Sequence, residues 1–166
     1  MSLVSEDKPQ FSSPACAMHE ADDAYMGYVT PEELATFLNE LLEAERAGSR
    51  VTLESAREAG SGAVADLMTA IQRDEARWCA MLLGHIEHLG AQPTATTGAF
   101  YGKAMAIAAM SERIAFLNRG QGWVVKKLGG MLPKVRDDKL HADLKAMLES
   151  HVANIALADK VAAETR

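Results

Sequence analysis

The sequence predicts an all-α domain built as an antiparallel four-helix bundle, and three observations support this fold class. Helix-forming residues dominate the 166 positions, whereas aromatic residues make up only 5% and prolines number five. Four long segments repeat their apolar residues at steps of three and four, as one face of a helix requires. The connections between these segments are short, long and short in turn. A chain of this length buries one core, so a single domain is expected.

The first predicted helix has a sharply marked start. Thr30 is placed as the N-cap, Pro31 occupies the first helical position, and Glu33 completes a capping box three residues after the cap. The helix is expected to run to about residue 58, before two glycines, and the second helix from about residue 62 to 89. Residues 1–29 show no apolar period, so we expect an N-terminal tail there and the helical domain over 30–166.

The long connection after the second helix predicts a crossover that contains a short helix. Residues 90–98 have turn chemistry around Pro93, and residues 99–110 are expected to form a short apolar helix. The third long helix is expected over about residues 111–132, where Pro133 stops it. The fourth begins at Asp137 or Asp138, since either can cap it. One long crossover is a feature of ferritin-like connectivity rather than of a simple up-and-down bundle.

Charge and hydropathy exclude two classes of partner. The formal net charge is −6 and no cluster of Lys and Arg is present, so we expect no nucleic-acid partner. No stretch approaches the ~18 uncharged apolar residues that span a bilayer, so we expect no membrane association. The first residues resemble no signal peptide, which favours a cytoplasmic location. Cys16 and Cys79 lie far apart and are expected to be free thiols.

Ionisable residues interrupt the apolar faces of the predicted helices. Glu45, Glu75 and His151 fall on the apolar stripes of three different helices, so each is expected to point inward. A buried carboxylate without a partner costs several kcal/mol, so such groups are usually neutral, ion-paired or bound to metal. Glu112 is a further candidate on the third helix, whose inward stripe is ambiguous between two phases.

A metal centre is one interpretation of these residues. Carboxylates and imidazole from facing helices are the ligands of di-iron and di-manganese sites. The sequence therefore predicts Glu45, Glu75, Glu112 and His151 as ligands of Fe or Mn, with Zn a further option. The full pattern has a His three residues after one Glu and a Glu three residues before one His. Trp78 and Leu148 occupy those positions instead, so a single ion, a poorly populated pair of ions or no metal at all stays open.

The competing interpretation is a non-catalytic structural or interaction bundle, expected to associate as a homodimer. In that case the inward acids form an ion-pair network that includes His151 and one or more nearby basic residues. These basic residues are Arg46, Arg73, Arg77, Lys103, Arg113 and Arg119. A polar, Gly-containing run at 118–123 lies inside the third helix and is compatible with a pocket, a helix contact or neither.

Four runs carry a family resemblance. Residues 38–48 (LNELLEAERAG), 73–79 (RDEARWC), 117–124 (LNRGQGWV) and 151–155 (HVANI) together resemble a small bacterial family of ferritin-like proteins labelled DUF6306. The resemblance extends from Thr30 to Val161 and implies the ferritin-like fold, but it implies no reaction. Within the wider ferritin-like superfamily, Glu45, Glu75 and His151 resemble metal ligands.

Overall fold

The computed structural model describes residues 22–165, and this part of the chain contains helices, turns and loops but no strand. The predicted all-α class is therefore confirmed. The helices in chain order are α2 Pro31–Ala59, α3 Ala63–His88, α4 Phe100–Met105, α5 Met110–Met131, the 3₁₀ helix η2 Leu132–Lys134, and α6 Asp138–Glu164. Most of the predicted tail, with Cys16, lies outside the described residues.

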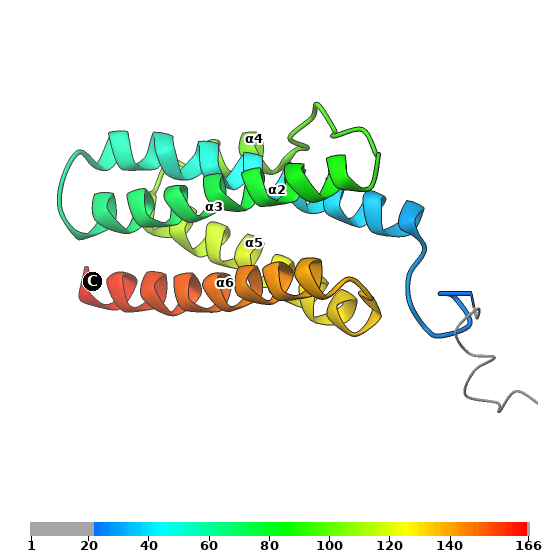
Figure 1. Cartoon of the computed structure of the whole chain (residues 1–166). Coiled ribbons are helices and arrows are strands. Elements are labelled where there is room, and N and C mark those ends of the chain that lie inside the picture. Colours follow the sequence, from blue (N-terminus) through cyan, green and yellow to red (C-terminus); the bar gives the residue numbers. More distant parts are fainter. Residues whose placement is uncertain (1–21, 166) are drawn as a thin grey trace, which may run out of the picture.

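Helix α2 begins at the predicted capping box. The Thr30 hydroxyl accepts a hydrogen bond from the Glu33 amide at 3.2 Å, and the Glu33 carboxylate accepts one from the Thr30 amide at 2.9 Å. The helix ends before Gly60 and Gly62, whose φ angles of +72° and +92° are readily adopted only by glycine. This tight turn reverses the chain, so α2 and α3 lie antiparallel and pack extensively on each other (Figure 1).

The crossover after α3 is fastened to α2 by side-chain hydrogen bonds. The Asn39 side chain accepts from the Thr94 amide at 2.7 Å and donates to the Gln92 carbonyl at 3.0 Å. The Glu43 carboxylate accepts from the hydroxyls of Thr94 and Thr96 at 2.7 and 2.6 Å. These contacts hold the segment that leads into α4 against the middle of α2.

Helix α4 is shorter than the sequence predicted. It spans Phe100–Met105, whereas a helix over 99–110 was expected. The Ile107 carbonyl, beyond its end, accepts hydrogen bonds from Arg113 Nε at 3.0 Å and Nη2 at 2.8 Å. A carbonyl held by this side chain is turned away from a continuing helix, so the chain breaks there before α5 begins at Met110.

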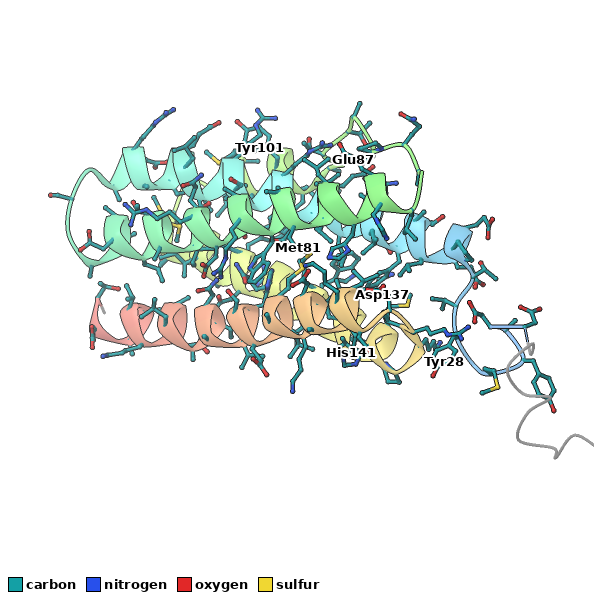
Figure 2. The ribbon with its side chains drawn as sticks, in the orientation of Figure 1. Tyr28, Met81, Glu87, Tyr101, Asp137 and His141 are labelled. Carbon is teal, nitrogen blue, oxygen red and sulfur yellow. The ribbon has the colours of Figure 1, made fainter. Side chains whose placement is uncertain are left out.

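Helices α5 and α6 form the second antiparallel pair. Pro133 lies in η2, directly after α5, and the Asp137 carboxylate caps α6 by accepting from the Leu140 amide at 2.7 Å. Figure 1 shows the α2/α3 pair laid over the α5/α6 pair, with α2 and α6 beginning at the same end of the molecule. The segment before α2 lies at that end, where the Val29 amide donates to the Lys134 carbonyl at 3.1 Å, and Figure 2 shows Tyr28 and Asp137 at the same end of the molecule.

The core consists of two apolar clusters with polar residues between them. One cluster includes Leu38, Leu41, Leu82, Leu128 and Leu144, and the other includes Val51, Met68, Ile71, Leu117 and Ala158. Along each of the four long helices, a polar residue falls between the stretch that enters one cluster and the stretch that enters the other. None of the helices in the described part of the chain is both long enough and apolar enough to cross a membrane.

Candidate functional site

Four buried polar side chains, one from each long helix, form a polar layer across the core. They are Glu45 from α2, Glu75 from α3, Gln121 from α5 and His151 from α6, and each is at most 4% exposed. Each lies three or four residues from buried apolar neighbours on its own helix, so the helical period turns it inward. The polar layer is therefore a direct consequence of where polar residues replace apolar ones along the stripes.

Glu45 and His151 form a buried pair that shares a proton. His151 Nε2 lies 3.0 Å from Glu45 Oε1, and its Nδ1 lies 2.9 Å from the Met147 carbonyl oxygen. Because a carbonyl oxygen can only accept, Nδ1 carries a hydrogen, and one more proton lies between Nε2 and the carboxylate. The pair as a whole is therefore uncharged, which suits its burial.

The pKa values of this pair agree with proton retention. Burial lowers the pKa of His151, but the hydrogen bond and charge of Glu45 outweigh burial, and the net pKa lies above the ordinary value. Burial raises the pKa of Glu45, and the hydrogen bond from His151 opposes this rise only in part. The pair thus keeps its shared proton to a higher pH than a free histidine would.

Glu75 is buried without a basic partner. Its Oε1 accepts from Gln121 Nε2 at 3.1 Å and its Oε2 accepts from the Thr52 hydroxyl at 3.3 Å. Burial raises the pKa of Glu75 well above its ordinary value, and the negative charge of Glu45 adds to the rise. A Cβ at Gly48 would lie 2.4 Å from Glu75 Oε1, so only glycine leaves room for this carboxyl group against α2.

A cavity of about 370 Å³ reaches from the polar layer to the surface. All four residues of the polar layer line it, and its apolar wall includes Phe100, Leu117 and Val124. Its lining also includes exposed positions, among them Gly98 and Ala99 of the crossover and Trp123 of α5, which is 39% exposed. The cavity therefore opens between α2, α5 and the crossover, with the polar layer at its inner side.

Two hydrogen-bond acceptors of the polar layer have no partner among residues 22–165. These are Glu45 Oε2 and Gln121 Oε1, and both belong to side chains that line the cavity. A buried polar atom left unpaired costs about 1–3 kcal/mol, so native proteins contain few of them. Two of the side chains that line the cavity thus each carry a free acceptor, and a guest molecule that reaches these side chains can satisfy it.

The 118–123 run, whose role the sequence left open, serves this cavity. A Cβ at Gly120 would lie 2.8 Å from the Phe100 ring, so glycine is needed for α4 to approach α5. Phe100 also stacks on Phe116, with ring centroids 4.9 Å apart. Gln121 bonds to Glu75, and Trp123 lies at the opening.

Three of the four predicted site residues come together, and one does not. Glu45, Glu75 and His151 face the same cavity, whereas Glu112 is exposed in the first turn of α5. The inward stripe of α5 is the phase that includes Ile114, Leu117, Gln121, Val124 and Leu128. Glu112 lies off this stripe, so its predicted inward orientation was wrong.

Sequence reasoning missed Gln121 as a residue of the polar layer. The spacing of the apolar residues could have predicted that Gln121 points inward, since it lies four residues after Leu117 and three before Val124. The glycines on either side of Gln121 indicated a helix contact or a pocket formed by the backbone, so this side chain was not predicted to take part.

The predicted network between the inward acids and nearby arginines or lysine is not formed among residues 22–165. Arg46 donates to the Thr94 carbonyl, Arg77 pairs with Asp74 at 3.1 Å, and Arg113 pairs with Glu58 at 2.5 Å. In the described chain, the one ion pair that involves an acid of the polar layer is that of Glu45 with His151. Glu75 is therefore held by neutral hydrogen-bond donors alone.

Cys79 lies beside this site on α3 and is half-buried. Burial, followed by the charges of Glu45 and Glu75, raises the pKa of the Cys79 thiol to about 12. The thiol therefore stays protonated at neutral pH and is a poor nucleophile.

The side chains as they lie do not fit an iron or manganese centre. In the described ranges, no group of three or more His, Cys, Asp and Glu side chains is arranged to hold a metal ion. Both nitrogens of His151 are engaged, one by Glu45 and one by the Met147 carbonyl. The indole of Trp78, at the position where the di-metal pattern has a histidine, points to the Ser150 hydroxyl, with 3.4 Å between Nε1 and Oγ.

Comparison with known proteins yields one family. The model of a family described as a domain of unknown function, DUF6306, matches residues 32–160. No curated protein and no solved structure matches the chain.

Proposed function

The chain belongs to DUF6306, a family of unknown function, and we propose that it binds a small organic molecule in the cavity beside the polar layer. The observation that carries this proposal is the free Oε2 atom of Glu45. Glu45 is 1% exposed, and this oxygen has no donor in the part of the chain that the structure describes, although the other carboxylate oxygen, Oε1, is bonded to His151. A ligand that donates a hydrogen bond there removes the cost of burying it unpaired.

The size and walls of the cavity agree with such a ligand. Small-molecule sites in proteins are about 300–1,000 Å³, mostly apolar, with a few fixed polar groups that orient the ligand. This cavity has about 370 Å³, apolar walls from Phe100, Leu117 and Val124, and polar groups at its inner side. The hydrogen bonds of Glu43 and Asn39 to the crossover keep one edge of the opening in place.

Binding can be tested with three small aromatic probes: 2-phenylethylamine, 2-phenylethanol and phenylacetate. Ligand-observed NMR and titration calorimetry on the full chain should detect binding of at least one of them. Replacing Ala44, which lines the cavity, by Leu should weaken that binding about tenfold or more, because the added methyl groups occupy the ligand's space.

The matched control for this variant is Ala80→Leu. Ala80 is exposed on α3, outside the residues that line the cavity, so binding should not change. If none of the three probes binds the wild-type chain, or if Ala44→Leu binds them unchanged, the cavity is not a ligand site.

A single metal ion is the second candidate for the same cavity. The specific observation in its favour is again Glu45 Oε2, a free carboxylate oxygen near Glu75 and His151. Such an ion would require His151 to give up its bond to Glu45 and Glu75 to lose its proton. Elemental analysis of protein purified without chelator tests this candidate. A stoichiometric Fe, Mn or Zn content that Glu75→Ala abolishes supports it, and metal-free protein that iron or manganese does not stabilise contradicts it.

We further propose that the fold is an antiparallel four-helix bundle of ferritin-like type. Two features support this: the pairs α2/α3 and α5/α6 pack on each other, and the long crossover between α3 and α5 contains α4. Association as a homodimer stays a prediction, which sedimentation equilibrium tests.

A further inference from the structure

The free polar atoms of the cavity are both acceptors. Glu45 Oε2 belongs to a carboxyl group and Gln121 Oε1 to an amide, and the amide nitrogen of Gln121 is already used on Glu75. A carboxylate or phosphate group on a ligand would therefore find no free donor from these two residues. The chemistry of the polar layer selects a guest that donates hydrogen bonds.

The charges around the cavity favour a positively charged donor over a neutral one. The Glu45–His151 pair is uncharged as a whole, and no Lys or Arg of the described chain forms an ion pair with Glu45 or Glu75. A cation that enters would thus find neither carboxyl group ion-paired with a Lys or Arg of the described chain, and Glu75 becomes its counterion when it gives up its proton. A charged donor also makes a stronger hydrogen bond than a neutral one.

The charged residues at the opening of the cavity also favour a cation. Glu40 and Glu43 of α2 both line it. Hydrogen bonds from Thr94 and Thr96 lower the pKa of Glu43, so this carboxylate stays ionised at neutral pH. Glu40 is neutralised by Lys127, whose Nζ lies 3.0 Å from both carboxylate oxygens. Within the described chain Glu43 forms no ion pair, and the nearby charge of Arg46 offsets part of its field, so the opening attracts cations only weakly.

The walls specify the rest of the ligand. The rings of Phe100 and Trp123 and the side chains of Leu117 and Val124 offer an apolar surface between the opening and the polar layer. Phe100 is fixed by its stacking on Phe116 and by its contact with the backbone at Gly120. An apolar, preferably aromatic, body fits this surface, since burying it removes apolar area from water.

We infer that the ligand is a primary amine with an apolar body, whose ammonium group donates to Glu45 Oε2 and Gln121 Oε1 beside Glu75. This inference rests on the proposed function and names the ligand class of the same cavity. The body of the amine lies between Phe100, Leu117 and Val124.

Calorimetry with the same three probes separates this inference from the proposed function. The probes share a phenyl ring and differ mainly in a cationic, a neutral or an anionic polar end. The amine should bind at least about tenfold more tightly than the alcohol, and phenylacetate should bind most weakly. Equal binding of amine and alcohol, or tightest binding of phenylacetate, would overturn the ligand class while leaving a ligand site. Binding of no probe would instead overturn the proposed function.

Two isosteric variants test the residues involved. Glu45→Gln and Glu75→Gln should each weaken amine binding about tenfold, and leave the alcohol within about twofold, because only the ammonium group forms a charge-assisted hydrogen bond with a carboxylate, and Glu75 becomes one when it gives up its proton to admit the amine. The second variant keeps the test valid if Glu45→Gln disturbs His151 and the protein fails to fold. Unchanged amine affinity in a folded variant of either kind would overturn the inference.

Glu87→Gln is the matched control. Glu87 is exposed on α3, as Figure 2 shows, and its side chain forms no hydrogen bond or ion pair with residues 22–165. Its substitution removes one negative charge of the same type, so amine affinity should stay unchanged. A loss equal to that of Glu75→Gln would show a general charge effect and contradict the assignment.

Discussion

Two buried polar regions of this protein differ in how completely they are satisfied. Arg113, at the start of α5, is 4% exposed, and its guanidinium donates to the Ile107 carbonyl, the Ser55 hydroxyl and the Glu58 carboxylate. The polar layer is equally buried, yet Glu45 Oε2 and Gln121 Oε1 find no partner within the described residues. Arg113 faces packed protein, whereas the polar layer faces a cavity.

This difference separates a structural role from a binding role. Arg113 joins α2, the α4–α5 connection and α5 by contacts that complete its hydrogen bonding, so its place in the fold is sufficient to explain it. Burying the polar layer lowers the free energy of unfolding, because its free acceptors lose their hydrogen bonds to water and gain none within the described chain. Such a cost is expected where a function uses those atoms.

The largest effect should come from Arg113→Met. The variant should lose about 3 kcal/mol of unfolding free energy in urea titrations, because the Ile107 carbonyl and Ser55 lose a buried donor. Glu58→Gln is the control and should cost less than about 1 kcal/mol, since Glu58 is half exposed. If Arg113→Met loses no more stability than the control, the structural role assigned to Arg113 is wrong.

His151→Leu should cost about 2 kcal/mol in the same measurement. The substitution leaves Glu45 buried without the group that shares its proton. Adding Glu45→Leu should recover part of this loss, because the double variant buries no unpaired acid. If the loss in the double variant equals the sum of the losses in His151→Leu and Glu45→Leu, the two residues are not energetically coupled.

Gly48→Ala should change stability in opposite directions in two backgrounds. In a Glu75→Ala chain it should stabilise α2 by up to about 1 kcal/mol, since alanine is the better helix former. In the wild-type chain the new Cβ would meet the Glu75 carboxyl group, and the gain should vanish or reverse. An equal gain in both backgrounds would show that Glu75 does not lie against Gly48.

At acidic pH, Glu75→Gln should change the free energy of unfolding least among these variants. The difference from the wild type should grow as pH rises. Burial, with the charges of Glu45 and Asp74, raises the folded-state pKa of Glu75, so the folded chain binds this proton more tightly than the unfolded one. Below the unfolded pKa near 4.5 the stability difference between wild type and variant should be flat.

As pH rises above that value, the wild type should lose stability relative to Glu75→Gln until the folded-state pKa is reached. For one proton the slope is at most about 1.4 kcal/mol per pH unit. Urea unfolding of both proteins across this pH range measures it. A wild type that gains stability relative to the variant as pH rises would mean that Glu75 is held ionised.

The helix faces were predictable from the sequence because period and burial are directly linked. Glu45, Glu75 and His151 were placed inward by the spacing of the apolar residues around them, and all three are buried. The capping box at Thr30 and the glycines after α2 set the start of one helix and the turn to the next in the same way. These features depend on residues close in sequence, so local reasoning reaches them.

The set of residues that form the site could not be predicted in full, because it depends on contacts between residues that are distant in sequence. The inward phase of α5 decides that Gln121 belongs to the polar layer and that Glu112 does not, and its neighbouring residues left two phases open. The break before α5 depends on Arg113 reaching back to the Ile107 carbonyl. The cavity itself depends on Phe100 packing against Gly120, a contact across the crossover that helical spacing cannot show.

The most direct measurement is a crystal structure of the full chain with 2-phenylethylamine. The account predicts the amine nitrogen within hydrogen-bond distance of Glu45 Oε2, with the phenyl ring against Phe100 and Leu117. An amine bound elsewhere, or a cavity that holds only water at saturating amine, would contradict it.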